Sequence, residues 1–223
     1  MIEQLKSRGF YYGSGAISSD GTRFIVNIPK NASSYLLDWS NRHEYTVALV
    51  SEIENQNQIQ EMIVVLRDPI ERWISGISQY LNTYILDVEG PNGPIHGIEN
   101  MTAFDYSMTA DHWIRNYNQN TERLIFDQIS RFDDHTWPQH EFFENLLPNA
   151  KRKYFYLDKD FDTNVMNYLG FEKFDNLDRN QGTDHPKIKE LQEFFRLRLN
   201  IRPELAERVK LHYYKDYEYI KSL

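Results

Sequence analysis

The stretch EMIVVLRDPIERWISGISQYL (61–81) constrains the fold more than any other part of the chain. Its run 62–66 is uniformly apolar, as in a strand that is buried on both faces. Asp68, Pro69 and Glu71 then have the spacing of an N-cap, a first helical residue and the second partner of a capping box. Apolar residues recur after them at helical spacing, at Ile70, Trp73, Ile74, Ile77 and Leu81. This stretch therefore predicts a buried strand, a tight turn and an amphipathic helix.

A second stretch, TRFIVNIPKNASSYLLDW (22–39), has the same organisation. It predicts a strand over 22–28 and a helix over 33–41. Similar patterns predict further strands over 45–50 and 153–157, and helices over 103–119, 138–147, 162–169, 187–199 and 203–221. Because strands alternate with helices, we expect one α/β domain over 1–223, with a central, mainly parallel sheet flanked by helices.

A long loop interrupts this alternation. DVEGPNGPIHGIEN (87–100) is dense in glycine and proline, which break regular structure. Loops of this length inside a compact domain are often functional. We therefore treat residues 84–100 as an insertion, and the aromatic-rich region 104–117 after it as a second candidate binding segment.

Composition excludes several classes of protein. The chain has no cysteine, which excludes disulfides and thiolate metal sites. Its net charge of −8 argues against general nucleic-acid binding, which needs a basic surface. No stretch approaches the length of a membrane span, and the first residues do not have the pattern of a signal peptide. We therefore expect a cytoplasmic protein without membrane partners. Nothing in the sequence indicates an oligomeric state.

The two predicted turns carry the chemistry of phosphate binding. In α/β sheets, ligands bind outside the carboxyl ends of the strands. A helix N-terminus there offers unpaired N–H groups and a partial positive charge. The first turn adds Lys30 and the hydroxyls of Ser33 and Ser34, although the order of residues is not that of a Walker motif. The second turn places Arg67 at a strand end and Ser75 eight residues later. Two such sites without a metal cluster indicate a nucleotide with phosphates at separate positions.

Both motifs resemble those of sulfotransferases. NIPKNASSYL (27–36) resembles the 5′-phosphosulfate loop of that family, and VVLRDPIERWISGISQY (64–80) resembles its 3′-phosphate motif, with the arginine-to-serine spacing intact. Three later segments are similar to the carbohydrate-sulfotransferase branch: DDHTWPQHEFF (133–143), YFYLDKDF (154–161) and ERVKLHYYKDYEYI (207–220). The chain departs from the family at Ala32-Ser33, where many members carry Gly-Thr or Cys-Thr.

The resemblance implies a P-loop NTPase-like sulfotransferase fold and the donor 3′-phosphoadenosine 5′-phosphosulfate (PAPS), with adenosine 3′,5′-bisphosphate (PAP) as product and no metal. Residues that would hold the 5′-phosphosulfate are Lys30, Asn31, Ala32, Ser33 and Ser34, through side chains and N–H groups. By the same resemblance, Arg67 and Ser75 would hold the 3′-phosphate. The acceptor would be a hydroxyl or amine of a carbohydrate, and a small-molecule or lipid alcohol is the alternative. The 84–100 insertion would lie on the acceptor side.

The general base is open at this stage. In sulfotransferases it often follows the second strand, which here favours Glu52 ahead of its neighbour Glu54. His135, in the HTWPQ segment, is the other main candidate, and His43 precedes the strand. Each of these residues has an ordinary structural interpretation as well: a solvated carboxylate or a packing histidine.

The motif residues also have structural alternatives. Lys30 could be a solvated loop lysine, and Arg67 could simply pair with Asp68 or Glu71. Two rival functions remain as well. One is a phosphate-transferring nucleotide enzyme. The other is a non-catalytic module that keeps the same fold.

Overall fold

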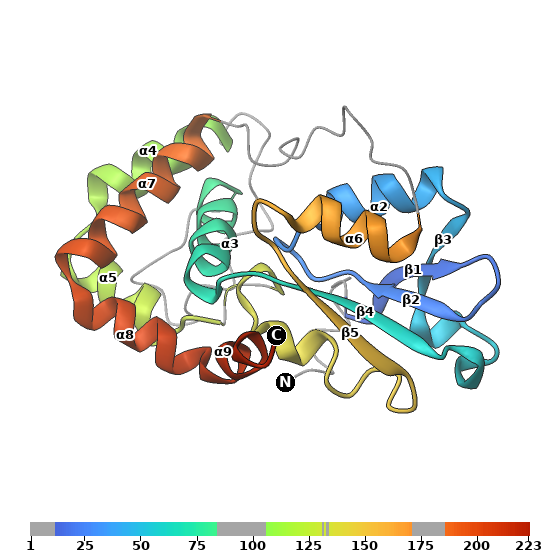
Figure 1. Ribbon diagram of the computed structural model, residues 1–223. Helices are drawn as coiled ribbons and strands as arrows, with labels where there is room; N and C mark the ends of the chain where they lie inside the picture. The colour runs from blue at the N-terminus through green and yellow to red at the C-terminus, as the bar shows by residue number, and fades with distance from the viewer. Residues whose placement is uncertain (1–11, 84–105, 131, 133, 171–185) are drawn as a thin grey trace. The chain divides into compact units, whose positions relative to one another are not determined.

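A computed structural model describes residues 12–83, 106–130, 132, 134–170 and 186–223 (Figure 1). The chain divides into two compact units. One, called here the sheet unit, comprises Met1–Asp68, Pro138–Gln181 and Lys215–Leu223. The other, the helical unit, comprises Pro69–Trp137 and Gly182–Tyr214. The expected loop over 84–100 lies outside the described residues, and so does the start of the 104–117 region.

The sheet unit is built on one five-stranded sheet with the order β3-β1-β2-β4-β5. Its strands are β1 (Ser14–Ser18), β2 (Arg23–Val26), β3 (Tyr45–Leu49), β4 (Glu61–Leu66) and β5 (Lys151–Tyr156). β2, β4 and β5 pair in parallel, and β1 is antiparallel to both of its neighbours. Four strands therefore run in one direction and β1 runs against them. This confirms an α/β fold with a mainly parallel sheet, to which β1 is an unpredicted addition.

Two helices pack against one face of this sheet. They are α2 (Ser33–Arg42) and α6 (Phe161–Leu169), which lie side by side in Figure 1. A continuous core joins them to the strands, with Trp39 of α2 and Val165 of α6 both at 0% exposure. Gly170 ends α6 with a φ of 79°, a left-handed C-cap that glycine adopts without strain. This core thus fixes α2, the helix that starts directly after the Lys30 turn.

The helical unit surrounds α3. Its helices are α3 (Pro69–Thr83), α4 (Tyr106–Asn116), α5 (Gln119–Asp127), α7 (Pro186–Ile201) and α8 (Pro203–His212), with the short 3₁₀ helix η4 (Asp134–Thr136). Trp73, Phe126 and Phe195 meet at its centre, with ring centroids 5.2 and 5.6 Å from that of Trp73. Aromatic contacts of this kind bury much apolar area, which explains how so small a unit keeps its own core.

Three helix predictions are corrected by the structure. The helix expected over 103–119 ends at Asn116, because the side chain of Asn118 caps the new helix α5 by accepting the N–H groups of Asn120 and Thr121. The helix expected over 203–221 breaks at the buried Tyr213, whose hydroxyl donates to the carbonyl of Thr136; α9 (Tyr214–Lys221) follows it.

The third correction concerns the helix expected over 138–147. Only the 3₁₀ helix η5 (Gln139–Phe142) forms there. The N–H groups of Gln139 and His140 donate to the carboxylate of Asp216, and Leu147 has a positive φ of 48°. The carboxylate binds the first N–H groups as an N-cap would, but the chain leaves the helical conformation at Phe143 (φ −130°), so only a short 3₁₀ turn forms.

A helix needs about 20 mostly apolar residues to cross a lipid bilayer. None of the helices in the described ranges could span one.

Candidate functional site

The two predicted turns meet in the sheet unit. Lys30 follows β2 and Arg67 follows β4, and because these strands are parallel neighbours their carboxyl ends share one edge of the sheet. The Arg67 guanidinium donates to the backbone carbonyl of Lys30 at 3.0 Å. The structure thus brings together the two residues on which the phosphate-binding hypothesis depends.

The Lys30 turn has an unusual backbone. Lys30 and Ala32 have positive φ values of 67° and 59°, whereas Asn31 between them does not. A left-handed conformation in a non-glycine residue costs about 1–2 kcal/mol. Backbones that alternate in hand in this way form concave nests of N–H groups that bind anions. The chain therefore maintains a strained turn at the position where the sequence predicts a phosphate.

Helix α2 starts directly after this turn, and no acidic side chain in its first turn neutralises the positive end of its dipole. Its N-cap is Ala32, which makes no side-chain hydrogen bond, and no acidic residue occupies the first turn. The first N–H groups of a helix have no acceptor within it, so the positive end of its dipole is available to an anion. Ser33 is the first helical residue; of Ser34 only the backbone is described. The N–H of Asn31 already donates to the carbonyl of Ile28 at 3.1 Å, within the turn.

Two buried side-chain amides bond to the backbone at the end of β4, beyond the residues that pair with β2. The Asn31 side chain, in a residue only 1% exposed, donates to the Val65 carbonyl at 2.7 Å and to Gln139 Oε1 at 2.5 Å. Gln139, at 0% exposure, accepts from the Arg67 N–H and donates to the Arg67 carbonyl, both at 2.9 Å. Buried backbone groups need hydrogen-bond partners, and the side chains of Asn31 and Gln139 are those partners here. Sequence reasoning missed Gln139, although the Pro-Gln segment was the available signal.

A buried carboxylate holds Gln139 in turn. Asp216 of α9 is 1% exposed and accepts from the N–H groups of Gln139 at 2.8 Å and His140 at 2.9 Å. Its Oδ1 also contacts His140 Nδ1 at 2.8 Å. Charge-assisted hydrogen bonds of this kind are stronger than neutral ones. The second turn is therefore connected to the C-terminal helix through a chain of buried polar groups.

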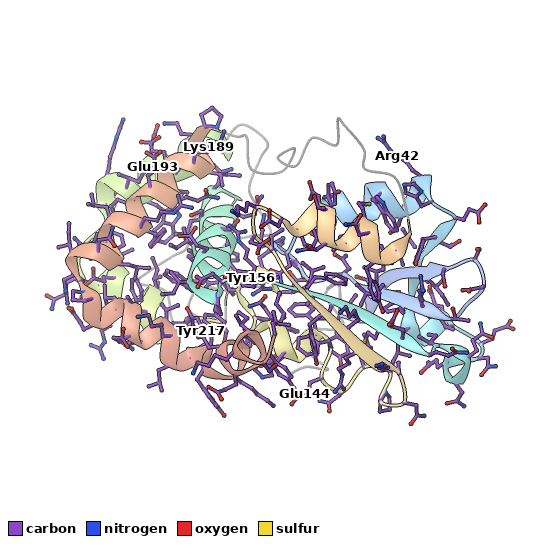
Figure 2. The ribbon with its side chains drawn as sticks, in the orientation of Figure 1. Arg42, Glu144, Tyr156, Lys189, Glu193 and Tyr217 are labelled. Atoms are coloured by element: carbon purple, nitrogen blue, oxygen red, sulfur yellow. The ribbon has the colours of Figure 1, made fainter. Side chains whose placement is uncertain are left out.

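Tyr156 is a second residue that sequence reasoning did not single out. It is the last residue of β5, paired with Leu66 beside Arg67, and Figure 2 labels it. Burial raises the pKa of the Tyr156 phenol above its usual value of 10, and the carboxylates of Asp68 and Asp158 add to the shift while Arg67 opposes it. At neutral pH this phenol is protonated and can donate a hydrogen bond at the same edge of the sheet.

The candidate bases of the sheet unit lie farther along the sheet. Glu52 is exposed in the 3₁₀ helix η1 (Val50–Glu52), where its carboxylate accepts from the Leu49 N–H at 3.4 Å. Glu52 follows β3 and Lys30 follows β2, and β1 lies between these two strands. The distance from β3 to β2 is therefore about 10 Å at the usual strand spacing. Glu54 is exposed as well.

His43 lies where β3 begins, at the opposite edge of the sheet from Lys30. Burial lowers the pKa of the His43 imidazole, and the positive charge of Arg42 lowers it further. This position does not favour His43 as the base.

His135 and Ser75 belong to the helical unit. His135 lies in η4, with Nδ1 3.2 Å from Asp134 Oδ1. Ser75 of α3 is 2% exposed, and its hydroxyl has no hydrogen-bond partner among the described residues. A Cβ on Gly76 would lie 2.3 Å from the His135 carbonyl oxygen, so only glycine permits this close approach of α3 and η4.

Two arginine contacts, one buried and one at the surface, complete this part of the unit. The Arg72 guanidinium, 1% exposed, donates to the carbonyls of Trp137 and Asp134. These bonds hold the segment 134–137, which contains His135, against α3. The Glu71 carboxylate pairs with Arg196 at 2.8 Å.

Comparison with known proteins adds no further information: no family model matches the chain, and neither a curated protein nor a solved structure matches it. Within the described ranges, no group of three or more histidine, cysteine, aspartate or glutamate side chains is placed to hold a metal ion.

Proposed function

We propose that the chain is a sulfotransferase that uses PAPS and transfers its sulfuryl group to a hydroxyl or amine of a carbohydrate. The observation that carries this proposal is the strained turn at Lys30 and Ala32, which leads into a helix N-terminus without a neutralising side chain and lies against Arg67. A turn of this kind binds anions, and the resemblance of both sequence motifs identifies the anion as the phosphosulfate of PAPS.

Each residue of the turn has a role in the proposed reaction. The acceptor oxygen or nitrogen attacks sulfur, the bond from sulfur to the bridging phosphate oxygen breaks, and PAP leaves. Negative charge grows on that bridging oxygen, where the Lys30 ammonium and the N-terminus of α2 stabilise it. The acceptor loses its proton to a general base, for which Glu52 is the first candidate and His135 the second.

By the sequence resemblance, the 3′-phosphate belongs to Arg67 of the sheet unit and to Ser75 of the helical unit, and the chemistry of each residue supports this by itself. Arginine offers a planar fork of donors that suits phosphate oxygens. A buried hydroxyl without a partner costs free energy, so Ser75, whose hydroxyl has none among the described residues, is suited to a ligand. The buried Ser78 hydroxyl of α3 has no partner among the described residues either, so it is the spacing from Arg67 in the motif that selects Ser75.

The fold proposed with this activity is the P-loop NTPase-like sulfotransferase fold. The parallel strands β2, β4 and β5 support it, because each is followed along the chain by a helix, namely α2, α3 and α6. This is the order of a repeated strand–turn–helix unit.

Titration calorimetry with PAP tests the donor site. We expect tight binding that needs the 3′-phosphate, so that 5′-AMP and ATP bind at least tenfold more weakly, and we expect Arg67→Ala to lose the preference. Arg23→Ala is the matched control, because Arg23 pairs with Glu61 at the amino end of the sheet. Equal binding of ATP would instead favour the phosphate-transferring enzyme.

Transfer of sulfate from PAPS to a panel of glycans tests the reaction itself. Lys30→Ala should lower the rate at least a hundredfold, whereas Lys151→Ala, at an exposed lysine that begins β5, should leave it unchanged. Transfer to lipid or small-molecule alcohols alone would reject the carbohydrate acceptor. PAP binding without transfer to any acceptor would favour the non-catalytic module.

A further inference from the structure

The side chain of Gln139 takes the place of a strand. The register that pairs Ile25 of β2 with Ile63 of β4 would, four residues later, set Pro29 opposite Arg67. Proline has no N–H, and the chain turns away there into the strained Lys30 turn. The Gln139 amide provides both a donor and an acceptor at this position, and so pairs with the Arg67 backbone as a neighbouring strand would.

Gln139 also connects the two phosphate-binding turns. Its Oε1 accepts both the Arg67 N–H and the side chain of Asn31, which lies between the two left-handed residues of the first turn. One oxygen thus sets the distance between the backbone that carries Arg67 and the backbone that carries Lys30. The Arg67 guanidinium adds a third link by its bond to the Lys30 carbonyl.

We propose that Gln139 is a positioning residue for the donor nucleotide: it fixes Arg67 relative to the Lys30 turn so that the two phosphate groups of one molecule can bind together. This inference rests on the proposed function, because it assumes that Arg67 reads the 3′-phosphate. Asp216 supports Gln139 by holding its N–H, and Gln139 is fully buried, so the amide has little freedom to adopt another orientation.

The test compares Gln139→Leu with Gln60→Leu, a matched change at an exposed glutamine that precedes β4. Leucine has a similar size but cannot pair with the Arg67 backbone. The measured quantity is the ratio of the dissociation constants of 5′-AMP and PAP, which reports use of the 3′-phosphate. We expect Gln139→Leu to lower this ratio at least tenfold and Gln60→Leu to leave it within twofold. A purely structural role of Gln139 would weaken both nucleotides equally and leave the ratio unchanged.

Hydrogen exchange of the free protein gives a second readout that needs no ligand. In Gln139→Leu the Arg67 N–H should exchange at least tenfold faster, while Ile63 in the middle of β4 keeps its rate. If Gln139→Leu does not fold, Gln139→Glu replaces it. That variant keeps an acceptor for the Arg67 N–H and loses the donor to the Arg67 carbonyl, so the tenfold criterion on the ratio of dissociation constants applies to it and the exchange criterion does not.

The outcomes separate this inference from the function on which it rests. A wild-type protein that prefers PAP, together with a Gln139 variant that keeps this preference within twofold, would overturn the positioning role alone. A wild-type protein without any preference for PAP would overturn the proposed function, and the positioning role with it.

Discussion

At Lys30 a strained backbone coincides with the role proposed for the side chain, so one substitution can separate stability from the proposed function. Lys30 adopts a left-handed conformation that glycine would adopt without strain. We therefore expect Lys30→Gly to be at least as stable as the wild type, with a gain of up to about 1 kcal/mol after the larger chain entropy of glycine is subtracted. Its sulfate transfer should nevertheless be lost. Chemical denaturation and a transfer assay measure the two quantities.

Glu44 provides the control for this prediction. It also has a positive φ, 59°, but lies in the turn before β3, at the amino edge of the sheet. Glu44→Gly should gain similar stability without any change in PAP binding. A loss of more than 1 kcal/mol in Lys30→Gly would show that its conformation is not the strained one described above.

A second residue with a measurable signature is Asp20. Hydrogen bonds from the Ser18 hydroxyl, and from the backbone and hydroxyl of Thr22, lower its pKa from 3.8 to about 2. Because the folded-state pKa is depressed, the stabilisation is present above the unfolded value and is lost as the pH falls through the folded value. In an NMR titration we expect Asp20 to titrate near 2, and Ser18→Ala to move its pKa upward. A wild-type pKa near 3.8 would contradict the turn geometry.

Among the elements, α3 offers the sharpest test of packing. Gly76→Ala would gain about 1 kcal/mol from helix propensity. The new Cβ would, however, lie 2.3 Å from the His135 carbonyl oxygen, which is backbone and cannot rotate away. Overpacking of this kind costs about 1–3 kcal/mol, so we expect net destabilisation in a denaturant titration. A net gain in stability would mean that η4 is not held against α3.

Helix α5 owes its start to a single side chain. Asn118 accepts from the N–H groups of Asn120 and Thr121 at 2.9 and 3.1 Å. Asn118→Ala should therefore lower the free energy of unfolding by about 1 kcal/mol. Asn120→Ala, at an exposed position in the same helix, should change it by less than about 0.5 kcal/mol. Equal effects of the two substitutions would contradict the cap.

The sequence predicts elements well where the signal is local. The strand over 62–66 and the helix after it were found because an apolar run and a capping pattern lie next to each other. β1 was missed because SGAIS (14–18) is short and contains only one large apolar residue, Ile17. The helix expected over 138–147 is cut to a 3₁₀ turn because the chain leaves the helical conformation at Phe143, where neither glycine nor proline marks an end in the sequence.

The candidate site shows the same difference between local signals, which the sequence reveals, and long-range contacts, which it does not. Lys30 and Arg67 could be placed at one edge from the parallel order of strands alone, and the structure confirms that they meet there. The hydrogen bonds that join Gln139 to Arg67 and to Asp216 could not be predicted, since each joins residues more than seventy positions apart. The roles assigned to Glu52, His135 and Ser75 stay predictions.

At the scale of the whole molecule, the donor product should stabilise the fold by mass action. PAP at a hundred times its dissociation constant should raise the free energy of unfolding by about 2.7 kcal/mol. For a chain of 223 residues this corresponds to a rise of about 5–10 °C in the melting temperature. Differential scanning calorimetry measures the shift, which 5′-AMP at the same concentration should not reproduce. An equal shift with Arg67→Ala would exclude Arg67 from the nucleotide site.

The connections of Gln139 also set the order in which the proposed site can form. Arg67 is bonded to a residue 72 positions later in the chain, and that residue is bonded to Asp216 a further 77 positions on. Synthesis runs from the N-terminus, and domains begin to fold during it. A nascent chain that already contains both turns has therefore not yet made the carboxylate that anchors their common partner, so the proposed nucleotide site should form only after Asp216 has been synthesised.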